Sequence, residues 1–574
     1  MVRVPGLILL LAACGDNALP APDPHCADWH QMGGNAQHTG ASCATGQAPE
    51  QILADVVIDQ LFDAELAASH YLPVHFQAPL IDDDRVFMVR KGGVYTPCEP
   101  MVPGDSQPCA HPADFHRFES QTWSEVGYAW QGDQLVEQWT FDSDWKPPLG
   151  HEVVFHPVIA GDRLVVPMGG GAVAYVDPET GETTKTVRPF GDDPDVYIVG
   201  ALAEWHGVVF YNAMKIDPVQ LYSDAQSWLV EIDTDGHPHK ADYADLVSGT
   251  PSDCYAGYAY NAMPVPLPWP PLDAQGNVVL PDTYPCGPQQ APFNAAPAIA
   301  PEGTVYVVSA AAYNASYAYL TSVNAGNFDV HWKTSLRDQL ADGCGVSIPY
   351  GSDVVDDECR EGAPMGIDPK TGLAPAGVIE DRSSSSPVVM PDGRILYGSY
   401  SEYNGRRGHL FQFARSGKVL GTYDFGWDLT PGVAVIDGET RIAMKDNHYG
   451  DYTPGSERGP YYLTLLSGDL EQVWQYQSTE TNTCARQPDG SVQCTDDHPH
   501  GFEWCISAPA IDAAGTIYGN SEDGNVYALG PDGTMKGRVF LDRALGASYT
   551  PVTLDHAGRV YALNAGHMYV VGAN

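Results

Sequence analysis

Charged, imidazole and aromatic side chains gather at a few points of the chain, where they could recognise a ligand. The densest group is Lys445-Asp446-Asn447-His448. Two others, Glu380-Asp381-Arg382 and Glu503-Trp504, and the single residue His156 stand just before Pro-led apolar strands. Such groups, if they gather at one opening of the fold, suit binding of a ligand or peptide. The alternative is that they form a solvated loop rim with local salt bridges, which uses the same residue types. The candidate binding residues are His156, Glu380, Asp381, Arg382, Lys445, Asp446, His448, Glu503 and Trp504.

Several motifs resemble metal sites only superficially. In His151-Glu152-Val153-Val154-Phe155-His156 the second histidine is at i+5, whereas a zinc-protease helix needs i+4. Two His-Pro-His triplets, 237–239 and 498–500, are expected on opposite faces of the molecule, so they cannot share an ion. Asp233-Thr234-Asp235-Gly236 lacks the later acidic ligand of a calcium loop. We therefore predict no metal ligands and no catalytic residues.

These side chains must be positioned by a unit that recurs eight times. Each copy is a Pro-led apolar strand, a turn rich in Asp and Gly, and a second apolar strand, as in Ala508–Asp512 and Thr516–Asn520. The anchors Pro387 and Pro431 are 44 residues apart, and Pro509 and Pro551 are 42 apart. A repeat of this size, with turns every eight to twelve residues, is typical of a four-stranded propeller blade. The sequence predicts an all-β fold, an eight-bladed β-propeller of antiparallel blades.

The last copy is incomplete, and this predicts how the ring closes. It supplies three strands, 550–554, 559–563 and 567–571, before the chain stops. The apolar segment 52–58 can supply the missing outer strand, which would remove an exposed sheet edge. We expect a single propeller over residues 29–574. Three tryptophans that close strand four, Trp139, Trp332 and Trp474, are interpreted as wedges between blades.

The N-terminus has the pattern of a targeting segment. Residues 1–13 carry a short basic start and the apolar run Leu7–Leu11, which is too short to span a bilayer. The run leads into Leu11-Ala12-Ala13-Cys14, which resembles the lipobox of bacterial lipoproteins; an ordinary secretory peptide is the alternative. The resemblance implies lipidation at Cys14 and, with Gly15 following, an outer-membrane address in the bacterial envelope. Residues 14–28 then form an extended Pro-containing linker.

Cysteine usage agrees with an oxidising compartment. Besides Cys14, ten cysteines fall into near neighbours inside irregular segments, and local disulfides are expected. Cys505 is left over and could replace either member of the last pair. The expected pairs are Cys26/Cys43, Cys98/Cys109, Cys254/Cys286, Cys344/Cys359 and Cys484/Cys494.

The formal net charge of −44 argues against nucleic acid and anionic lipid as partners. A lipid anchor is therefore the only membrane attachment expected.

The insertions between repeated strands are all expected on one face. They fall either between strands two and three, such as 91–122 and 212–227, or between blades, such as 246–292 and 478–505. In a propeller both kinds of connection open on the same side. Long loops on a rigid scaffold often carry function. We therefore predict a working face carrying disulfide-pinned loops.

The segment Trp29-His30-Gln31-Met32-Gly33-Gly34-Asn35-Ala36-Gln37-His38-Thr39-Gly40 resembles the opening motif of pyrroloquinoline-quinone-like propeller repeat proteins. Units such as Gly515–Tyr518 followed by Asp523–Leu529 resemble their blades. That superfamily includes quinoprotein alcohol dehydrogenases and the outer-membrane β-barrel assembly scaffold lipoprotein. The dehydrogenases hold a quinone and Ca²⁺ at the centre of this face, with a vicinal Cys-Cys disulfide over the quinone. The present sequence has no Cys-Cys pair, and no cofactor ligand is carried over.

Two functions follow from the sequence. The first is a non-catalytic, lipid-anchored scaffold that binds an envelope protein or a polysaccharide through the loop face, without a cofactor. The alternative is a periplasmic oxidoreductase that depends on pyrroloquinoline quinone or Ca²⁺. One fold hosts many activities, so the resemblance does not choose between them.

Overall fold

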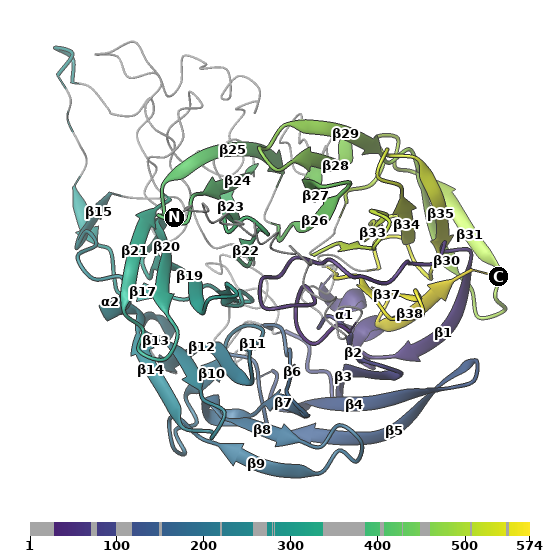
Figure 1. Cartoon of the computed structure of the whole chain (residues 1–574), viewed down its shortest axis with the longest axis horizontal. Helices are drawn as coiled ribbons and strands as arrows, with labels where there is room; N and C mark the ends of the chain where they lie inside the picture. Colours follow the sequence, from purple (N-terminus) through teal and green to yellow (C-terminus); the bar gives the residue numbers. More distant parts are fainter. Residues whose placement is uncertain are drawn as a thin grey trace, which may run out of the picture.

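Eight antiparallel sheets stand in a ring around a central axis (Figure 1). The computed structural model describes residues 28–69, 77–98, 117–148, 152–217, 221–255, 273–277, 279, 282–336, 385–401, 407–426, 429–447, 460–504, 508–546 and 550–573. Each sheet has four strands or, in blades 3 and 4, five, because the inner strand is split in two. The predicted eight-bladed propeller is confirmed.

The strands follow one another from the axis outward within each blade. Blade 1 is β2 (Leu80–Asp82), β3 (Arg85–Gly93), β4 (Gln121–Gln131) and β5 (Gln134–Ser143), and blade 2 is β6 (Val158–Ala160), β7 (Arg163–Pro167), β8 (Val173–Val176) and β9 (Thr183–Val187). Blade 3 is β10 (Val196–Ile198), β11 (Ala203–Trp205), β12 (Val208–Asp217), β13 (Leu221–Ile232) and β14 (Pro238–Asp242), and blade 4 is β17 (Gln289–Gln290), β18 (Ala298–Ile299), β19 (Thr304–Ala311), β20 (Asn314–Asn324) and β21 (Val330–Ser335).

The second half of the ring has the same plan. Blade 5 is β22 (Val388–Val389), β23 (Ile395–Ser401), β24 (Arg407–Phe413) and β25 (Val419–Gly426), and blade 6 is β26 (Gly432–Ile436), β27 (Glu439–Asn447), β28 (Tyr461–Ser467) and β29 (Gln472–Gln477). Blade 7 is β32 (Ala510–Ile511), β33 (Ile517–Asn520), β34 (Asn525–Leu529) and β35 (Met535–Phe540), and blade 8 is β36 (Thr553–Leu554), β37 (Val560–Asn564), β38 (His567–Gly572) and β1 (Gln51–Val57).

The repeated turn is stable because an aspartate side chain accepts hydrogen bonds from backbone N–H groups of the turn. In blade 7, Asp512 Oδ1 accepts from Ala514 N at 2.9 Å and from Thr516 N at 2.7 Å, while Gly515 takes a φ of +78°. Glycine enters this left-handed region without strain. Asp555 makes the equivalent bonds in blade 8 and also accepts from Tyr561 OH at 2.9 Å. The Asp-x-x-Gly pattern therefore fixes the inner hairpins of blades 7 and 8 locally.

The tryptophans that close strand four do pack between blades, as predicted. Trp139, Trp332 and Trp474 each donate the indole N–H to a carbonyl in the next blade, at Pro178 O (3.1 Å), Arg415 O (2.8 Å) and Pro531 O (2.9 Å). Each ring also lies against a glycine of that blade's outer turn, at Gly181, Gly417 and Gly533. A side chain at those glycines would collide with the ring, so the two residue types form one joint.

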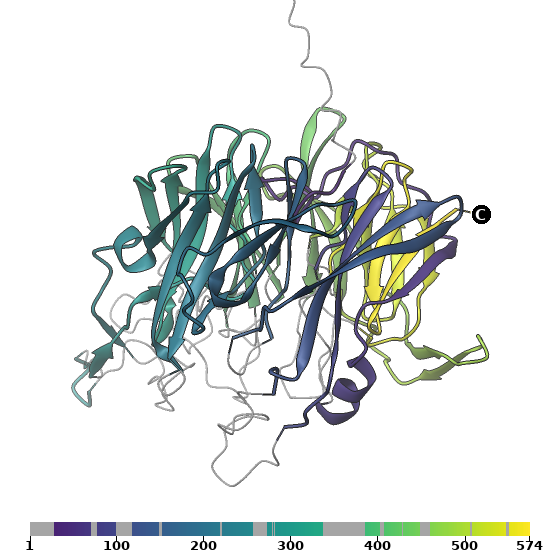
Figure 2. The ribbon, with the colours of Figure 1, turned by 90° about the horizontal axis from the view of Figure 1, so that it is seen from below.

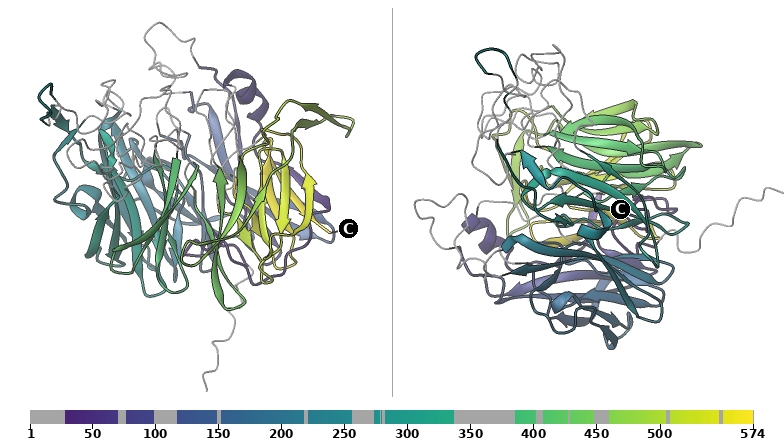
Figure 3. Two further views of the ribbon diagram at one scale, coloured as in Figure 1. Left: turned by 90° about the horizontal axis from the view of Figure 1, so that it is seen from above. Right: turned by 90° about the vertical axis from the view of Figure 1, so that its left-hand side faces the viewer.

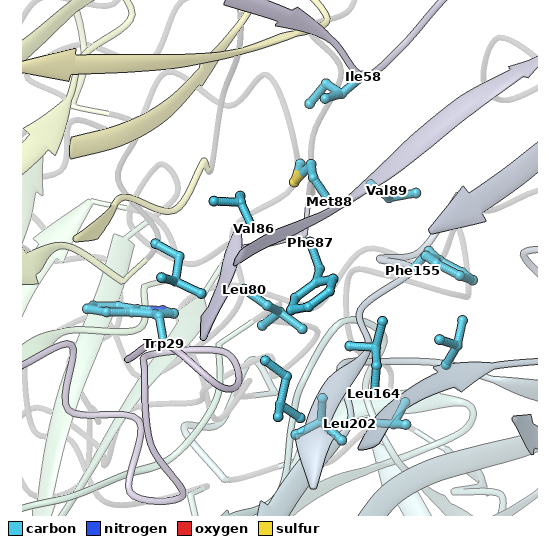
Figure 4. Packing of buried hydrophobic residues seen from close by; sticks show 14 of the residues in the cluster. Trp29, Ile58, Leu80, Val86, Phe87, Met88, Val89, Phe155, Leu164 and Leu202 are labelled. Carbon is cyan, nitrogen blue, oxygen red and sulfur yellow. The ribbon is translucent and has the colours of Figure 1, made fainter. Parts of the chain in front are cut away.

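The segment predicted as the closing strand forms β1, which pairs antiparallel with β38 from Gln51/Gly572 to Val57/His567. The buried core that includes Trp29 and Leu80 joins blades 1, 2, 3, 7 and 8. Figure 4 shows Phe87 of blade 1 pointing toward Leu164 of blade 2. Blade 8 thus combines strands from both halves of the chain.

Residues 29–47 run around the axis and touch the inner part of every blade in sequence order, which the sequence did not predict. Figure 1 shows this purple segment at the centre of the ring. Most contacts are backbone hydrogen bonds near the end of an inner strand, where the short turn begins. In blade order, the pairs are Trp29 with Ile81, His30 with Ile159, Gln31 with Glu204, Ala36 with Ile299, Gln37 with Val389, Thr39 with Val433, Gly40 with Ile511 and Gln47 with Gly558. We call residues 29–47 the central segment.

The two faces of the ring differ as predicted. We call the side with the short turns and the central segment the turn face, and the other side the loop face. Helix α1 (Phe62–Ser69), the hairpin β15 (Asp253–Tyr255) with β16 (Thr283–Pro285), and the hairpin β30 (Asn482–Arg486) with β31 (Val492–Asp496) all extend on the loop face (Figures 2 and 3). A second, four-residue helix, α2 (Tyr243–Leu246), follows blade 3. Neither helix was predicted, because each is too short to show an apolar period.

Two predicted loop insertions are largely strand. Residues 212–227 continue β12 and β13, which pair out to Asp217 and Leu221, and residues 311–317, also expected from the sequence as an insertion between strands two and three, fall largely within β19 and β20. Alternating polar residues on a long hairpin look like a loop in sequence, since cross-strand pairing is not local information.

Disulfides pin both described hairpins of the loop face. Cys254 is bonded to Cys286 and Cys484 to Cys494, as predicted. Cys43 and Cys98 are also disulfide-bonded, and their predicted partners Cys26 and Cys109 lie outside the described residues. Cys14, Cys344, Cys359 and Cys505 lie outside them as well. Within the described ranges, no helix is long and apolar enough to cross a membrane.

Candidate functional site

A pocket of about 400 Å³ opens on the loop face over blades 1 to 3. Its walls come from connections that all end on that face: the chain before β4, the chain after β5, the β7–β8 loop and the chain after β9. The lining residues are Phe118, Glu119, Asp144, Trp145, Lys146, Pro147, Met168, Gly169, Gly170, Arg188, Asp192, Asp193, Pro194, Val196 and Tyr197. The volume is within the usual range for small-ligand sites.

Two glycines shape one wall of the pocket. Gly169 N donates to Asp144 Oδ1 at 2.7 Å, and Gly170 takes a φ of +69°. A Cβ on Gly170 would come within 3.0 Å of Asp193 O, so this wall is held against the chain after β9. Asp193 in turn pairs with Lys215 at 2.6 Å, and this hydrogen bond lowers the pKa of Asp193. Asp144 and Asp193 are thus fixed acceptors beside the pocket.

Donors and apolar groups complete the lining. Arg188 is exposed, and Lys146 is half-buried with its ammonium 5.5 Å from the centre of the Trp123 ring. Lys146 Nζ also donates to Gln121 O. Burial lowers the pKa of Lys146. Tyr197 and Met168 add half-buried apolar surface, so the pocket offers donors, acceptors and apolar contacts together.

Next to this pocket, four ionisable groups converge where α1 meets blade 1. Lys91 Nζ lies 2.8 Å from Glu65 Oε1 and 2.7 Å from Glu152 Oε1. Asp59 caps the chain leading into α1, because its Oδ1 accepts from Leu61 N at 2.8 Å. Gln121 joins this cluster to Lys146, since its Nε2 donates to Glu65 Oε1 at 3.4 Å. The cluster and the pocket are therefore continuous on the loop face.

The cluster has three carboxylates around one ammonium, and this imbalance perturbs their protonation. Burial and repulsion from Glu152 raise the pKa of Glu65 to about 7, against the attraction of Lys91. Burial also raises the pKa of Asp59. Burial opposes the charge of Lys91, but Glu152, Asp59 and Glu65 raise its pKa above the usual value. The loop face thus carries a buried excess of negative charge beside the pocket.

A chain of aromatic rings leads from the pocket into the ring. Phe118, Trp123, Trp145 and Phe155 follow one another edge to face, with centroids 6.3, 5.3 and 5.3 Å apart. Such contacts add stability beyond the burial of area. They make the floor of the pocket rigid.

The predicted binding group 445–448, as far as the structure describes it, is buried and makes hydrogen bonds inside the fold. Lys445 and Asp446 are buried, and Asp446 Oδ2 accepts from Tyr423 OH, Thr464 Oγ1 and Gln475 Nε2 at 2.8, 3.1 and 2.9 Å. Trp504 is also buried, and its backbone N and O pair with the amide of Asn447 at 3.2 and 3.1 Å. These groups tie blades 5, 6 and 7 together below the surface.

The remaining predicted residues fall in different places. Glu503 is half-buried, and its carbonyl accepts from Glu522 N at 3.1 Å. His156 directly precedes the inner strand β6 and is fully buried, with Nδ1 2.8 Å from Pro157 O. Glu380, Asp381, Arg382 and His448 lie outside the described residues.

Sequence reasoning missed Glu65, Lys91, Lys146, Arg188 and Tyr197. Two signals were available: Lys91 begins the insertion 91–122, and three successive glycines at 169–171 mark a close approach of backbone. Glu152 was considered only as part of a false zinc motif, yet it belongs to the Lys91 cluster.

A calcium-bound quinone would need free carboxylate and amide oxygens near the axis on the loop face. In the described part of that region, Asp446 and Asn447 already serve the internal bonds given above. Three described groups have ligand atoms close enough to share an ion, and all lie at short turns of the opposite face: Asp28/His30/Asp82, Asp83/Asp84/His556 and Asp233/Asp235/His237. The described residues therefore do not fit this cofactor.

Comparisons with solved structures find other propellers. The quinohemoprotein alcohol dehydrogenase of Comamonas testosteroni has a TM-score of 0.49 and 11% identity, over 96% of this chain and 82% of that chain. A europium-containing methanol dehydrogenase has a TM-score of 0.44 and 10% identity, over 93% and 89%. BamB from Moraxella catarrhalis has a TM-score of 0.37 and 13% identity, over 78% and 89%. No protein-family model and no curated protein matches the sequence.

The resemblance noted in the sequence agrees with these similarities, which join dehydrogenases and a BamB. At such low identity and TM-score they do not bear on activity.

Proposed function

We propose that this protein is a non-catalytic, lipid-anchored binding propeller of the bacterial cell envelope, and that its loop face recognises a polysaccharide. The observation that carries the proposal is the pocket over blades 1 to 3, which combines fixed acceptors, cationic donors and apolar surface. The sequence supports the envelope address through the lipobox-like motif at Cys14 and the paired cysteines.

A saccharide suits this lining because each hydroxyl both donates and accepts a hydrogen bond. Asp144 and Asp192 can accept, and Lys146 and Arg188 can donate. Tyr197 and Met168 offer apolar surface for the C–H face of a pyranose. The Lys91 cluster places negative charge beside the pocket, which favours neutral or amino sugars over acidic ones.

Glycan-array binding of the purified protein, followed by calorimetry on the best ligand, tests the proposal. We expect Tyr197→Ala and Arg188→Ala each to weaken binding at least tenfold, which corresponds to about 1.4 kcal/mol. Arg163→Ala is the matched control, because Arg163 begins β7 at the turn face of the same blade. Absence of glycan binding, together with capture of an envelope protein that these variants abolish, would replace the polysaccharide by a protein partner.

The oxidoreductase alternative is tested separately by adding pyrroloquinoline quinone and Ca²⁺ to the purified protein. We expect no stoichiometric uptake and no alcohol- or sugar-dependent dye reduction, because the side chains of Asp446 and Asn447, the described oxygen ligands considered for the cofactor, already form hydrogen bonds within the fold. Stoichiometric uptake with substrate-dependent reduction would overturn the non-catalytic assignment.

A further inference from the structure

The start of the central segment is joined to blade 1 by a short antiparallel bridge. Trp29 N donates to Ile81 O at 2.8 Å, and Ile81 N donates to Trp29 O at 2.9 Å. In an antiparallel pair the neighbours of the bridged residues also face each other, so Asp28 lies opposite Asp82. Side chains alternate along an extended chain, so His30 shares the side of Asp28, while Trp29 is buried in the core (Figure 4). The bridge therefore brings two carboxylates and one imidazole to the same place.

The side chains of this group converge at three atoms. His30 Nε2 lies 3.7 Å from Asp28 Oδ2 and 3.6 Å from Asp82 Oδ1. These three atoms all lie within 4.8 Å of one another. Zn²⁺ binds imidazole nitrogen and carboxylate oxygen at about 2.0–2.2 Å, which places two ligands of a tetrahedral ion about 3.4 Å apart. Both distances from His30 are only slightly longer than this separation.

The second oxygen of each carboxylate is held by a group outside the three atoms. Asp28 Oδ1 accepts from Asp83 N at 3.2 Å, and Asp82 Oδ2 accepts from Arg85 Nη2. The two oxygens that come near His30 are the other member of each pair. Carboxylates that ligate a metal are typically oriented in this way by outer hydrogen bonds. The two aspartates are thus aimed at the imidazole by contacts that do not involve it.

The charges of the group favour a cation between the carboxylates. Like charges directly opposite each other on paired strands are destabilising. The side chains of Asp28 and Asp82 are only 11% and 19% exposed, so water screens their repulsion weakly. Arg85 supplies one positive charge to Asp82, but its Nη1 also lies 3.9 Å from Glu179 Oε1. One shared guanidinium does not balance all three carboxylates, whereas a divalent ion next to it would.

We propose that Asp28, His30 and Asp82 bind one Zn²⁺ ion at the turn face, a site separate from the loop-face pocket. One imidazole nitrogen with two carboxylate oxygens suits Zn²⁺ better than Ca²⁺ or Mg²⁺, which take oxygen ligands. Three protein ligands leave the fourth position to water. The ion fastens the end of the expected linker 14–28 to the inner turn of blade 1, in addition to the two backbone bonds.

Titration of the full-length protein with Zn²⁺, in competition with a chromophoric chelator, tests this site. Free thiols are first alkylated with iodoacetamide, since Cys505 has no predicted disulfide partner. We expect the wild type to retain one equivalent of Zn²⁺, and Asp28→Asn and His30→Gln each to bind it at least about tenfold more weakly. Both variants keep polar side chains of similar size, so the backbone bridge should persist.

The matched control is His237→Gln. It removes the histidine of the group Asp233/Asp235/His237, which has the same composition, but His237 is 72% exposed. This variant should retain Zn²⁺ like the wild type. The proposal is overturned if the wild type retains no Zn²⁺, if His30→Gln binds like the wild type, or if His237→Gln loses the ion.

Amide exchange of the wild type gives a second readout that does not depend on the variants folding. Opening of the bridge separates the ligands, so bound Zn²⁺ should slow exchange at the N–H groups of Trp29 and Ile81. At a free Zn²⁺ concentration 100 times the dissociation constant we expect this exchange to slow roughly 100-fold. Unchanged exchange would mean that a proton on His30, and not a metal, lies between the carboxylates. X-ray absorption should show imidazole and oxygen ligands, and sulfur coordination would also overturn the proposal.

Discussion

Glu125 on β4 is a carboxyl group with no exposed surface, and its environment decides its charge. Gln77 Nε2 donates to Glu125 Oε1 at 3.0 Å, while Oε2 has no hydrogen-bond partner among the described residues. Burial raises the pKa of Glu125 to about 8, against the hydrogen bond from Gln77. The side chain is therefore mostly protonated at neutral pH, which makes its burial tolerable.

The stability of the protein should fall as the pH rises through this window. The pKa of Glu125 is about 8 in the folded state and near 4.5 in the unfolded chain, so the folded state binds more protons between these values. Glu125→Gln stays neutral and should be insensitive. We expect the free energy of unfolding of Glu125→Gln, relative to the wild type, to increase by at least about 2 kcal/mol from pH 5 to pH 8.

Urea denaturation of the wild type and of Glu125→Gln across that pH range measures the difference in their free energies of unfolding. The contributions of the other titrating groups are common to both proteins and cancel in this difference. A constant difference would show that Glu125 is ionised in the folded state.

Trp474 carries a second prediction at this scale, because its indole N–H bonds to Pro531 O in the next blade. Trp474→Phe keeps an aromatic ring but removes that donor and some volume. We expect a loss of about 1–2 kcal/mol in the free energy of unfolding. Trp332→Phe should behave alike, since its bond to Arg415 O has the same form. If both variants lose less than a few tenths of a kcal/mol in the free energy of unfolding, packing of the aromatic ring, without the hydrogen bond, is what holds the two blades together.

Among the elements, the hairpin β30–β31 lies along blade 7 and is held in two ways. Its disulfide joins Cys484 to Cys494. Its backbone also bonds to the chain after β35, where Arg486 N donates to Asp542 O at 2.7 Å and Ala544 N donates to Cys484 O at 2.8 Å. Arg486 Nε adds a bond to Leu541 O at 2.9 Å. The hairpin is therefore attached as a unit to an already complete blade.

Removing the disulfide should loosen this hairpin alone. For Cys484→Ser/Cys494→Ser we expect faster amide exchange over residues 482–496, by up to the roughly 3 kcal/mol that closing such a loop contributes. Exchange in β33 and β34 should not change, because their bonds lie within the blade. The double variant Cys254→Ser/Cys286→Ser is the control and should leave 482–496 as in the wild type. Faster exchange throughout blade 7 would contradict this view.

At the scale of the whole molecule, the central segment determines that the described chain starts on the turn face. The described chain starts at Asp28 on the turn face, and only 13 residues separate that position from Cys14. Even fully extended they reach about 45 Å. If Cys14 carries the lipid, the turn face is directed toward the membrane and the loop face is directed away from it, where a ligand can reach the pocket.

This orientation can be measured on lipidated protein in liposomes. Fluorophores on Asp437→Cys, at the exposed β26–β27 turn, and on Asp489→Cys, at the exposed tip of β30–β31, report the two faces. We expect a headgroup quencher to act more strongly at 437 than at 489. Cys14→Ser should abolish membrane binding altogether. Equal or reversed quenching would contradict the orientation.

The repeated unit and its count were legible from sequence because turn chemistry is local. Asp512 and Gly515 in blade 7, and Asp555 and Gly558 in blade 8, set the inner hairpin within a few residues, and the missing strand of the last unit predicted β1. The paired cysteines of β30 and β31 were predicted for the same reason, since their partners are ten residues apart.

Only the tertiary structure decided what meets at the axis and on the loop face. His38 reaches Pro387 across 349 residues, and Lys91 joins Glu65 to Glu152 through three separate segments. These contacts depend on where the central segment runs and on how distant segments pack once the ring is closed, and no local pattern encodes either. The sequence therefore determined the scaffold and its two unlike faces, while packing around the closed ring determined the pocket, the charge cluster and the burial of His38.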